Sequence, residues 1–556
     1  MILVTELVFL VSLAGFSLFR AYNPEIAYTE KPMEFGFINA ILRSLTFPPN
    51  DQWLSGYAIS YYYFGYVIAA MLTRLSGLPS DITFNLTLVT MFALTVSGAF
   101  SLVYNMVRAY LQRHRGAEEK EHRLACWAAP LTGLLGSTLV AVMGNLEGVF
   151  ELIRAHGWGS EALWAWLDVK NLQALPTNDS WWWWRASRVI HDRDLLGNSM
   201  EVIDEFPFFS FLLGDNHPHV LALPFVLLAL ALALNVVLSW RQRSATVAEP
   251  SIKGGLWGAW QRFTVSLWPD GSFDPVLWAL LLGSLGFLNT WDYPIYLAIF
   301  VAAYAFRRQA DYDRLGWSWL GDVVQLGVLL LVLGVALYLP FYLGFRSQAG
   351  GIGRLGEIKT RWNQYLLMFG VFIFCVASLL AALWVRYWRS APAGRRVSPV
   401  AQVAGGLAVV LLGLAVAQGW WTSALILVLA GGAGVLLLSA ARFTHVAPTL
   451  APAQGGAHSR GERELGEETL PDGGEPTGAR ADKSLIPPFG HALSQGEREP
   501  AMTDSSLFAL LLMVVGLLLT LSVEFIFLKD TFNSRMNTVF KFYYQGWVLM
   551  GLASAY

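Results

Sequence analysis

Apolar runs of about 20 residues recur along nearly the whole chain, and each is long enough to cross a bilayer as one helix. The run Val220–Trp240, for example, contains no charged side chain. Of the 556 residues, 55% are hydrophobic and only 14% are charged, which is too apolar a composition for a soluble protein of several domains. The sequence therefore predicts an all-α polytopic protein of the cell membrane, with the lipid bilayer as its partner.

Windows of about 20 residues predict about 11–13 transmembrane helices. The segment Tyr61–Leu75 is expected to lie along the membrane interface, because two full spans between Tyr57 and Arg108 would leave both flanks on one side. The apolar segments lie near Ile2–Phe19, Tyr61–Leu75, Leu86–Val107, Leu124–Val142, Val220–Trp240, Val276–Leu288, Ile295–Phe306, Leu320–Tyr342, Tyr365–Tyr387, Val400–Ala417, Thr422–Ala441, Leu507–Phe527 and Val539–Tyr556.

Clusters of Arg and Lys in the short loops predict which loops are cytoplasmic, because cationic loops stay inside. The remaining loops, 20–57, 143–206 and 343–363, are then external and are expected to hold interfacial helices. The predicted domains are a transmembrane region at 1–441, a disordered cytoplasmic insert at 442–506 and a transmembrane pair at 507–556. The insert is rich in Gly, Pro and charge. The last segment stops inside an apolar run, so we expect a fragment truncated at its C-terminus.

Carboxylates gather in the first external loop, at the border of the membrane. Glu30 and Glu34 alternate there with apolar side chains, and Asp51 follows a Pro-Pro turn. A carboxylate in this position can act as a general base that deprotonates an acceptor hydroxyl, because the low dielectric raises its pKa towards a useful value. The alternative is a solvated loop whose acids merely face water.

A second cluster, EFPFFSFLLGDNHPH, precedes a predicted span and ends in Asp215, His217 and His219. The spacing D-x-H-x-H could ligate a divalent metal ion, which is the one candidate cofactor, although no cofactor is certain. It could equally bind a phosphate through His217 and His219 with the help of a helix N-terminus. The third alternative is a pair of structural histidines at the interface.

A third cluster, SVEFIFLKDTFNSRMNTVFKFYYQ, places cations at the start of the last span. Arg535 and Lys541 are six residues apart, close enough to meet one anionic group, and Asn537 lies between them. These three residues are candidates for binding a diphosphate or a polyprenyl phosphate. The alternative is a pair of cations that reach from a span end to the interface.

Together these motifs resemble a known family. The segments NPEIAYTEKPMEFGFINAILRS, SGYAISYYYFGY, SRVIH, EFPFFSFLLGDNHPHV, LNTWDYP and RMNTVFKFYYQ are similar to the "YYY" family of large membrane proteins, DUF2298, which itself resembles the GT-C type of glycosyltransferases. The resemblance covers about Thr5–Leu343 and Leu507 to the end. This sequence departs from the family pattern at Glu34, where the family has Asp, and at Asn216, where it has Leu.

The resemblance implies a GT-C-like enzyme that takes a sugar from a polyprenyl-phosphate-linked donor at the outer membrane face. Glu30 or Glu34 would then be the base, with Asp51 third, and Asp215, His217 and His219 would orient the donor phosphate or a metal. Arg535 and Lys541 would neutralise the leaving phosphate. The residues expected to bind substrate are Tyr61, Tyr62, Tyr63, Trp291 and Asp292.

Two classes of protein without catalysis remain open beside the enzyme. A transporter or lipid-handling protein would use the same groups as a permeation or headgroup site, and a scaffold of the cell envelope would need no ionisable site. Nucleic acid is excluded as the main partner, because the formal net charge is −2 and nucleic-acid binding requires clustered excess Lys and Arg.

Overall fold

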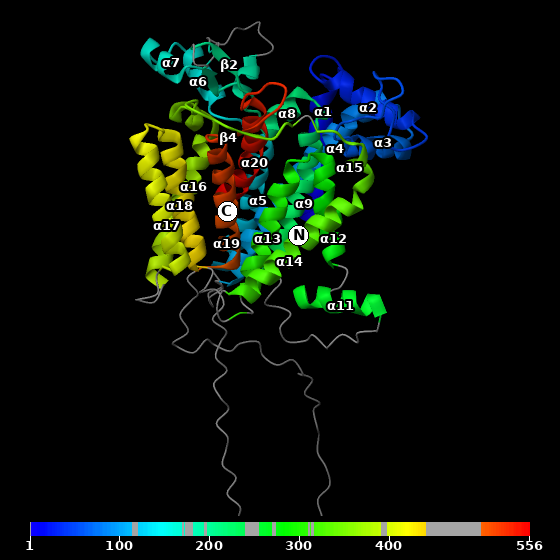
Figure 1. The fold of residues 1–556 in the computed structure, drawn as a ribbon. Coiled ribbons are helices and arrows are strands. Elements are labelled where there is room, and N and C mark those ends of the chain that lie inside the picture. The colour runs from blue at the N-terminus through cyan, green and yellow to red at the C-terminus, as the bar shows by residue number, and fades with distance from the viewer. Residues whose placement is uncertain are drawn as a thin grey trace, which may run out of the picture.

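The computed structural model shows a bundle of long helices with shorter elements gathered at one end (Figure 1). It describes residues 2–113, 121–169, 172, 182–193, 197–238, 255–268, 274–309, 312, 316–347, 349–390, 397–440 and 502–556. The helices in the first half of the chain are α1 Ile2–Ala21, α2 Lys31–Arg43, α3 Phe64–Ser76, α4 Ser80–Arg113, α5 Glu121–Ser137, a π-helical turn Thr138–Val142, α6 Glu147–Ala155, α7 Glu161–Leu167, a 3-10 turn Trp182–Ser187, α8 Pro207–Leu213, α9 Pro218–Leu238 and α11 Gly255–Leu267.

The second half continues the same pattern of long helices joined by short turns. These helices are α12 Asp274–Leu288, α13 Asp292–Gln309, α14 Trp317–Leu337, α15 Leu339–Gly344, α16 Trp362–Ser390, α17 Pro399–Ala417, α18 Trp421–Ala440, α19 Asp504–Ser522 and α20 Met536–Ala555. The described residues also contain two antiparallel strand pairs. Strand β1 His191–Arg193 pairs with β2 Ser199–Glu201, and β3 Ile352–Arg354 pairs with β4 Ile526–Leu528.

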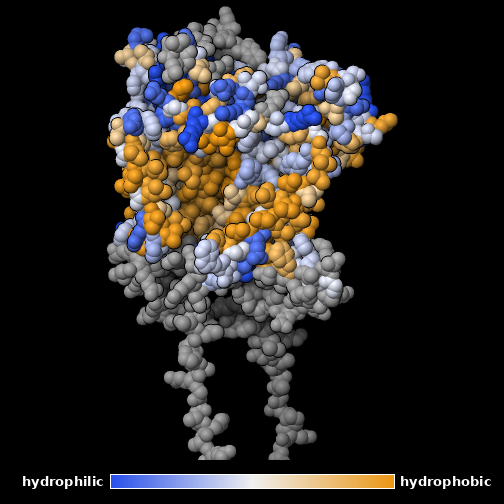
Figure 2. Space-filling model, viewed as in Figure 1, coloured by the Kyte–Doolittle hydropathy of each residue, from blue (hydrophilic) through white to orange (hydrophobic). Residues whose placement is uncertain are grey.

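Eight of the described helices, α1, α4, α9, α14, α16, α17, α18 and α19, are long and apolar enough to cross a membrane. A ninth span is added if Trp127–Val142 and Glu147–Ala155, which meet at a bend of 75°, are counted as one. Figure 2 shows the matching surface, a band of apolar side chains below a more polar end. The prediction of an all-α, multi-pass membrane protein is confirmed. The number of 11–13 spans stays a prediction, since it also needs shorter or more polar helices such as α12, α13 and α20.

The SYYYFGY motif leads into α3, a helix of 13 residues. At about 1.5 Å per residue it is too short to cross a hydrocarbon core of about 30 Å, and its position along the interface stays a prediction. The LNTWDYP motif forms the turn between α12 and α13, where the Asp292 N–H donates to the Asn289 carbonyl over 2.9 Å. This turn lies at the same end of the bundle as α2 (Figure 1).

The predicted insert at 442–506 lies almost entirely outside the described residues, which resume at Met502. Helix α19 begins at Asp504, with the Thr503 side chain accepting a hydrogen bond from the Ser506 N–H as its N-cap. The last transmembrane pair therefore starts three residues before the predicted boundary at 507. The predicted division into 1–441, 442–506 and 507–556 otherwise stays a prediction.

Close helix packing and one tight turn depend on glycine. A Cβ at Gly283 of α12 would lie 2.6 Å from the Gly334 carbonyl oxygen of α14, so the two backbones approach as only small residues allow. Gly214 ends α8 with a φ of 83° and packs against the Arg20 guanidinium, where a Cβ would lie 2.6 Å from Nη1. This turn places the two histidines that follow it at the start of α9.

Candidate functional site

A cavity of about 330 Å³ lies at the starts of α2, α9, α13 and α20. Segments far apart in the chain contribute to it, including the first external loop and the segment that follows α15. Its lining residues are Glu30, Ser60, Tyr61, Tyr62, His217, Pro218, His219, Asn289, Trp291, Phe345, Arg346, Ser347, Ala349, Leu528, Asp530, Phe532, Asn537, Phe540, Lys541, Tyr544 and Gln545. Most of the predicted site residues therefore surround one space.

Two carboxylates line this cavity, Glu30 and Asp530, and Glu30 is the one beside the histidines. Its Oε2 lies 2.6 Å from Nε2 of His217, and its side chain is 54% exposed, so one carboxylate oxygen remains accessible. The hydrogen bond from His217 lowers the pKa of Glu30 below its ordinary value, and this effect outweighs the opposing effect of burial. Glu30 is therefore ionised at neutral pH and able to accept a proton.

His217 and His219 extend from Glu30 into the protein. Nδ1 of His217 lies 2.8 Å from Nδ1 of His219, and Nε2 of His219 lies 3.2 Å from Oγ of Ser210. The Ser210 hydroxyl in turn lies 3.3 Å from Oε2 of Glu205. The Tyr61 hydroxyl lies 3.1 Å from Nε2 of His217, on the cavity side. Both histidines thus belong to a chain of hydrogen bonds that runs inward from the cavity.

The cavity lining also includes a cation, Lys541. The Lys541 ammonium lies 5.7 Å from the centroid of the Trp291 ring, and within the described part of the chain it forms no ion pair within 4.0 Å. Asn537, one turn earlier on α20, donates from Nδ2 to Asp530 over 2.6 Å. Helices α9, α13 and α20 all begin here, so the positive ends of their dipoles face the same region. This part of the lining suits an anionic group such as a phosphate.

Glu34 and Asp215 do not line the cavity. Glu34 is fully buried, and its Oε2 accepts a hydrogen bond of 2.7 Å from the Asn216 N–H, whereas Oε1 has no partner. Asp215 accepts from the Thr29 hydroxyl over 2.8 Å. Burial raises the pKa of Glu34 well above its ordinary value, and nearby Asp215 raises it further. Glu34 therefore does not share the position of Glu30 at the cavity, and its carboxyl joins α2 to the turn before α9, so its role as a base stays a prediction.

Arg535 is also absent from the cavity, which corrects the expectation that it and Lys541 meet one anion. Its guanidinium is buried and donates to both oxygens of Asp192, over 2.7 and 2.6 Å, and to Oε1 of Glu524 over 3.1 Å. Glu524 also accepts from the Thr360 N–H over 2.9 Å. The guanidinium is thus paired with carboxylates of the protein itself. Through these bonds Arg535 connects strand β1 to the turn before α20.

Three further predicted residues lie outside the cavity lining. Asp51 accepts hydrogen bonds of 2.8 Å from the N–H groups of Trp53 and Leu54, as a turn residue. Tyr63 packs edge-on against Phe287, with ring centroids 4.7 Å apart. Asp292 is buried and accepts a bond of 2.8 Å from Gln545, so it supports a lining residue rather than reaching the space itself.

The proposed metal ligands do not assemble into a metal site. Among the described residues, no group of three or more His, Cys, Asp or Glu side chains is placed to hold a metal ion. The physical reason is that Asp215 is bonded to Thr29, whereas His217 and His219 are bonded to each other. The arrangement of the described residues thus gives no support to Asp215, His217 and His219 as a set of metal ligands.

The sequence reading missed several lining residues. Arg346 follows α15 with an exposed side chain, and Asp530, Phe540 and Tyr544 line the wall beside Lys541. An isolated Arg after an apolar run in a predicted external loop was the one available signal for Arg346. Phe540 and Tyr544 sit one turn apart on α20 and pack edge-on around the His219 ring, at centroid distances of 4.8 and 4.7 Å.

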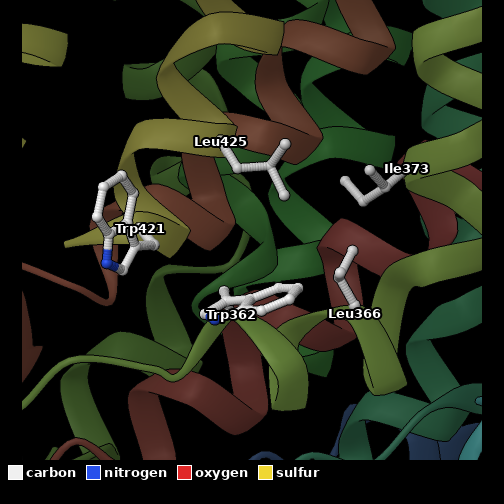
Figure 3. Close-up of a pocket in the computed structure, with 5 residues that line it drawn as sticks. All are labelled: Trp362, Leu366, Ile373, Trp421 and Leu425. Atoms are coloured by element: carbon white, nitrogen blue, oxygen red, sulfur yellow. The ribbon is translucent and has the colours of Figure 1, made fainter. Parts of the chain in front are cut away.

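A second cavity, of about 550 Å³, lies between α16 and α18 and is shown in Figure 3. Its wall consists of apolar side chains only, which ring a hollow in this view: Trp362, Leu366, Ile373, Trp421 and Leu425. Without an ionisable group it offers no acid, base or phosphate ligand. Of these two cavities in the described part of the chain, the first is the one lined by ionisable side chains.

Comparison with known proteins gives one match. The sequence model of a family described as "Uncharacterized membrane protein (DUF2298)" matches residues 1–550. No curated protein and no solved structure matches the chain significantly.

Proposed function

The chain belongs to the DUF2298 family of uncharacterized membrane proteins, and we propose that it is a membrane glycosyltransferase that uses a polyprenyl-phosphate-linked sugar donor. The acceptor hydroxyl would receive the sugar at the outer membrane face. One observation carries the proposal: the Glu30 carboxylate and the Lys541 ammonium line the same cavity at the end of the membrane helices. Sugar transfer from a lipid phosphate needs a base and a cation in this arrangement.

Glu30 supplies the base. As the acceptor oxygen bonds to the anomeric carbon, the bond from that carbon to the donor phosphate breaks, and the acceptor proton passes to Glu30. The free oxygen of the half-exposed carboxylate can meet this proton, while the other oxygen stays bonded to His217. Tyr61 and Tyr62 line the same side and offer aromatic faces and hydroxyls to a sugar.

Lys541 supplies the positive charge for the leaving phosphate. Its ammonium has no ion-pair partner among the described residues, so its charge is available to a ligand, and Arg346 lines the cavity as a second cation. The starts of α9, α13 and α20 add their partial positive charge. A membrane-bound donor suits this cavity, because its lining includes the start of α9, one of the helices long and apolar enough to cross a membrane.

The test uses the full chain in lipid vesicles with a panel of radiolabelled polyprenyl-phosphate hexoses and pentoses. Release of polyprenyl phosphate is measured for the wild type, for Glu30→Gln and for the control Glu25→Gln, whose exposed carboxylate lies in the same loop but outside the cavity. We expect release with at least one donor, its loss in Glu30→Gln and its retention in Glu25→Gln. Release from no donor would overturn the proposal and favour a transporter or a lipid-handling protein.

A further inference from the structure

We propose that Glu30 and the buried Glu205 exchange a proton through a hydrogen-bonded wire of His217, His219 and Ser210. The inference concerns proton movement in the resting protein and goes beyond the proposed sugar transfer. Its starting observation is that five groups from three parts of the chain follow one another with no gap longer than 3.3 Å. The four links, in order from the cavity, are 2.6, 2.8, 3.2 and 3.3 Å.

The bond between the two imidazoles fixes how the hydrogens are arranged. Both atoms are Nδ1, so one histidine must donate and the other accept, and the two rings must carry opposite tautomers. If His217 carries its hydrogen on Nε2, that hydrogen faces Glu30, and His219 donates from Nδ1 while its Nε2 accepts from Ser210. In the second arrangement each hydrogen has crossed its own hydrogen bond, from the donor atom to the former acceptor atom.

The two arrangements contain the same number of protons. In the first, Glu30 is ionised and Glu205 is protonated and donates to Ser210. In the second, Glu30 is protonated and donates to His217, and Ser210 donates to ionised Glu205. Moving one hydrogen across each of the four links converts one into the other, so a proton taken up by Glu30 results in a protonated Glu205 while every hydrogen moves only along an existing hydrogen bond. No oxidant, reductant or second reactant is needed.

The direction of transfer follows from the surroundings of the two carboxyl groups. Glu30 is half-exposed, and its bond with His217 lowers its pKa, whereas burial raises the pKa of Glu205 to about 7. A proton therefore moves from Glu30, the weaker base, to Glu205, the stronger base. A carboxylate of low pKa is a poor final acceptor, and the wire returns Glu30 to its ionised form when Glu205 is ionised at the start and takes up the proton.

Other charged groups lie near the wire and affect the protonation of its members. Arg188 and Asp215 act on Glu205, with Arg188 favouring its ionised form and Asp215 opposing it. Lys541 of α20 interacts with His219 from the cavity side, and Tyr544 and Phe540 exclude water around that ring. Glu34 and Asp215 interact with Glu30. When Glu205 loses its proton to solvent, the Tyr61 hydroxyl, 3.1 Å from Nε2 of His217, can fill the link that is left without a hydrogen.

The test is ¹⁵N NMR of the full chain, labelled at histidine and reconstituted in lipid vesicles without any substrate. Resonances of the two histidines are assigned by their loss in His217→Gln and His219→Gln, and spectra are recorded below and above the titration of Glu205 near pH 7. We expect opposite tautomers in the two rings at low pH and their joint inversion at high pH. In Glu205→Gln, whose amide does not titrate, the inversion with pH should disappear.

The control Glu161→Gln removes an exposed carboxylate at the start of α7 and should keep the inversion. The same tautomer in both rings, or an inversion that survives Glu205→Gln, would overturn the wire. Because no substrate is present, the wire can fail while sugar transfer is observed, and sugar transfer can fail while the wire is observed. The two proposals are therefore tested separately.

Discussion

Oε2 of Glu30 lies 2.6 Å from Nε2 of His217, and this contact joins the start of α2 to the turn before α9. It holds a carboxylate of the first external loop at the edge of the cavity, with its second oxygen free. Glu34, four residues later, turns into the protein and is fully buried. The two carboxylates, which the sequence offers as equal candidates for the base, therefore lie in different surroundings.

Replacing Glu30 by Gln should abolish the proton acceptor while keeping the size of the side chain. We expect kcat for sugar transfer to fall by about 10²-fold or more, the usual contribution of a positioned base. The measurement is release of labelled polyprenyl phosphate under saturating donor. Glu25→Gln should transfer at the wild-type rate, and a Glu30→Gln protein of unchanged kcat would exclude Glu30 as the base.

Replacing Glu34 by Gln should leave sugar transfer intact and change the pH dependence of stability. Because burial raises the folded-state pKa of Glu34, the neutral form is favoured by folding, and that stability is lost as the pH rises through the folded-state pKa. Gln is neutral at every pH and can still accept the Asn216 N–H. The thermal midpoint of the wild type should therefore fall more steeply towards alkaline pH than that of Glu34→Gln.

The two proteins should have similar thermal midpoints at acidic pH, where the Glu34 carboxyl is neutral in the wild type. Glu25→Gln is the matched control and should follow the wild-type pH profile. An alkaline midpoint of Glu34→Gln that falls as steeply as that of the wild type would show that Glu34 is not the group that titrates.

Replacing Lys541 by Gln should weaken the stabilisation of the leaving phosphate. Hydrogen bonds to charged groups contribute about 1.5–3 kcal/mol, so kcat/KM for the lipid-linked donor should fall by roughly 10-fold to 100-fold. Lys529→Gln is the matched control, because Lys529 is exposed in the turn before α20 and does not line the cavity. Equal losses in both variants would mean that a general surface charge, not the cavity, attracts the donor.

The sequence was sufficient for the class of fold because the length and apolar character of a span are local properties. The turn at Asn289–Trp291 was likewise visible as an interruption between two apolar runs. The sequence alone could not distinguish Glu30 from Glu34 as the carboxylate at the cavity. The difference between them is that the turn before α9 covers Glu34 and leaves Glu30 half-exposed. The pairing of Asp192 with Arg535 joins residues far apart in the chain, and no local pattern indicates it. The ion pairs of Arg535 with Asp192 and Glu524 could therefore not be predicted from the local motif around Arg535.

Replacing Arg535 by Gln should destabilise the fold rather than only slow a reaction. The guanidinium is the shared partner of Asp192 and Glu524, which are both buried, and its loss would leave two carboxylates without the cation that pairs with both. Breaking a buried ion pair from one side costs about 3–5 kcal/mol. We therefore expect a large drop in the thermal midpoint of the purified protein, and a smaller but clear drop for Arg535→Lys, whose ammonium cannot bond both oxygens of Asp192 and reach Glu524.

Arg354→Gln, which removes an exposed Arg from strand β3, should leave the midpoint unchanged. A normal midpoint combined with weaker donor binding in Arg535→Gln would instead return Arg535 to the phosphate-binding role that the motif first suggested.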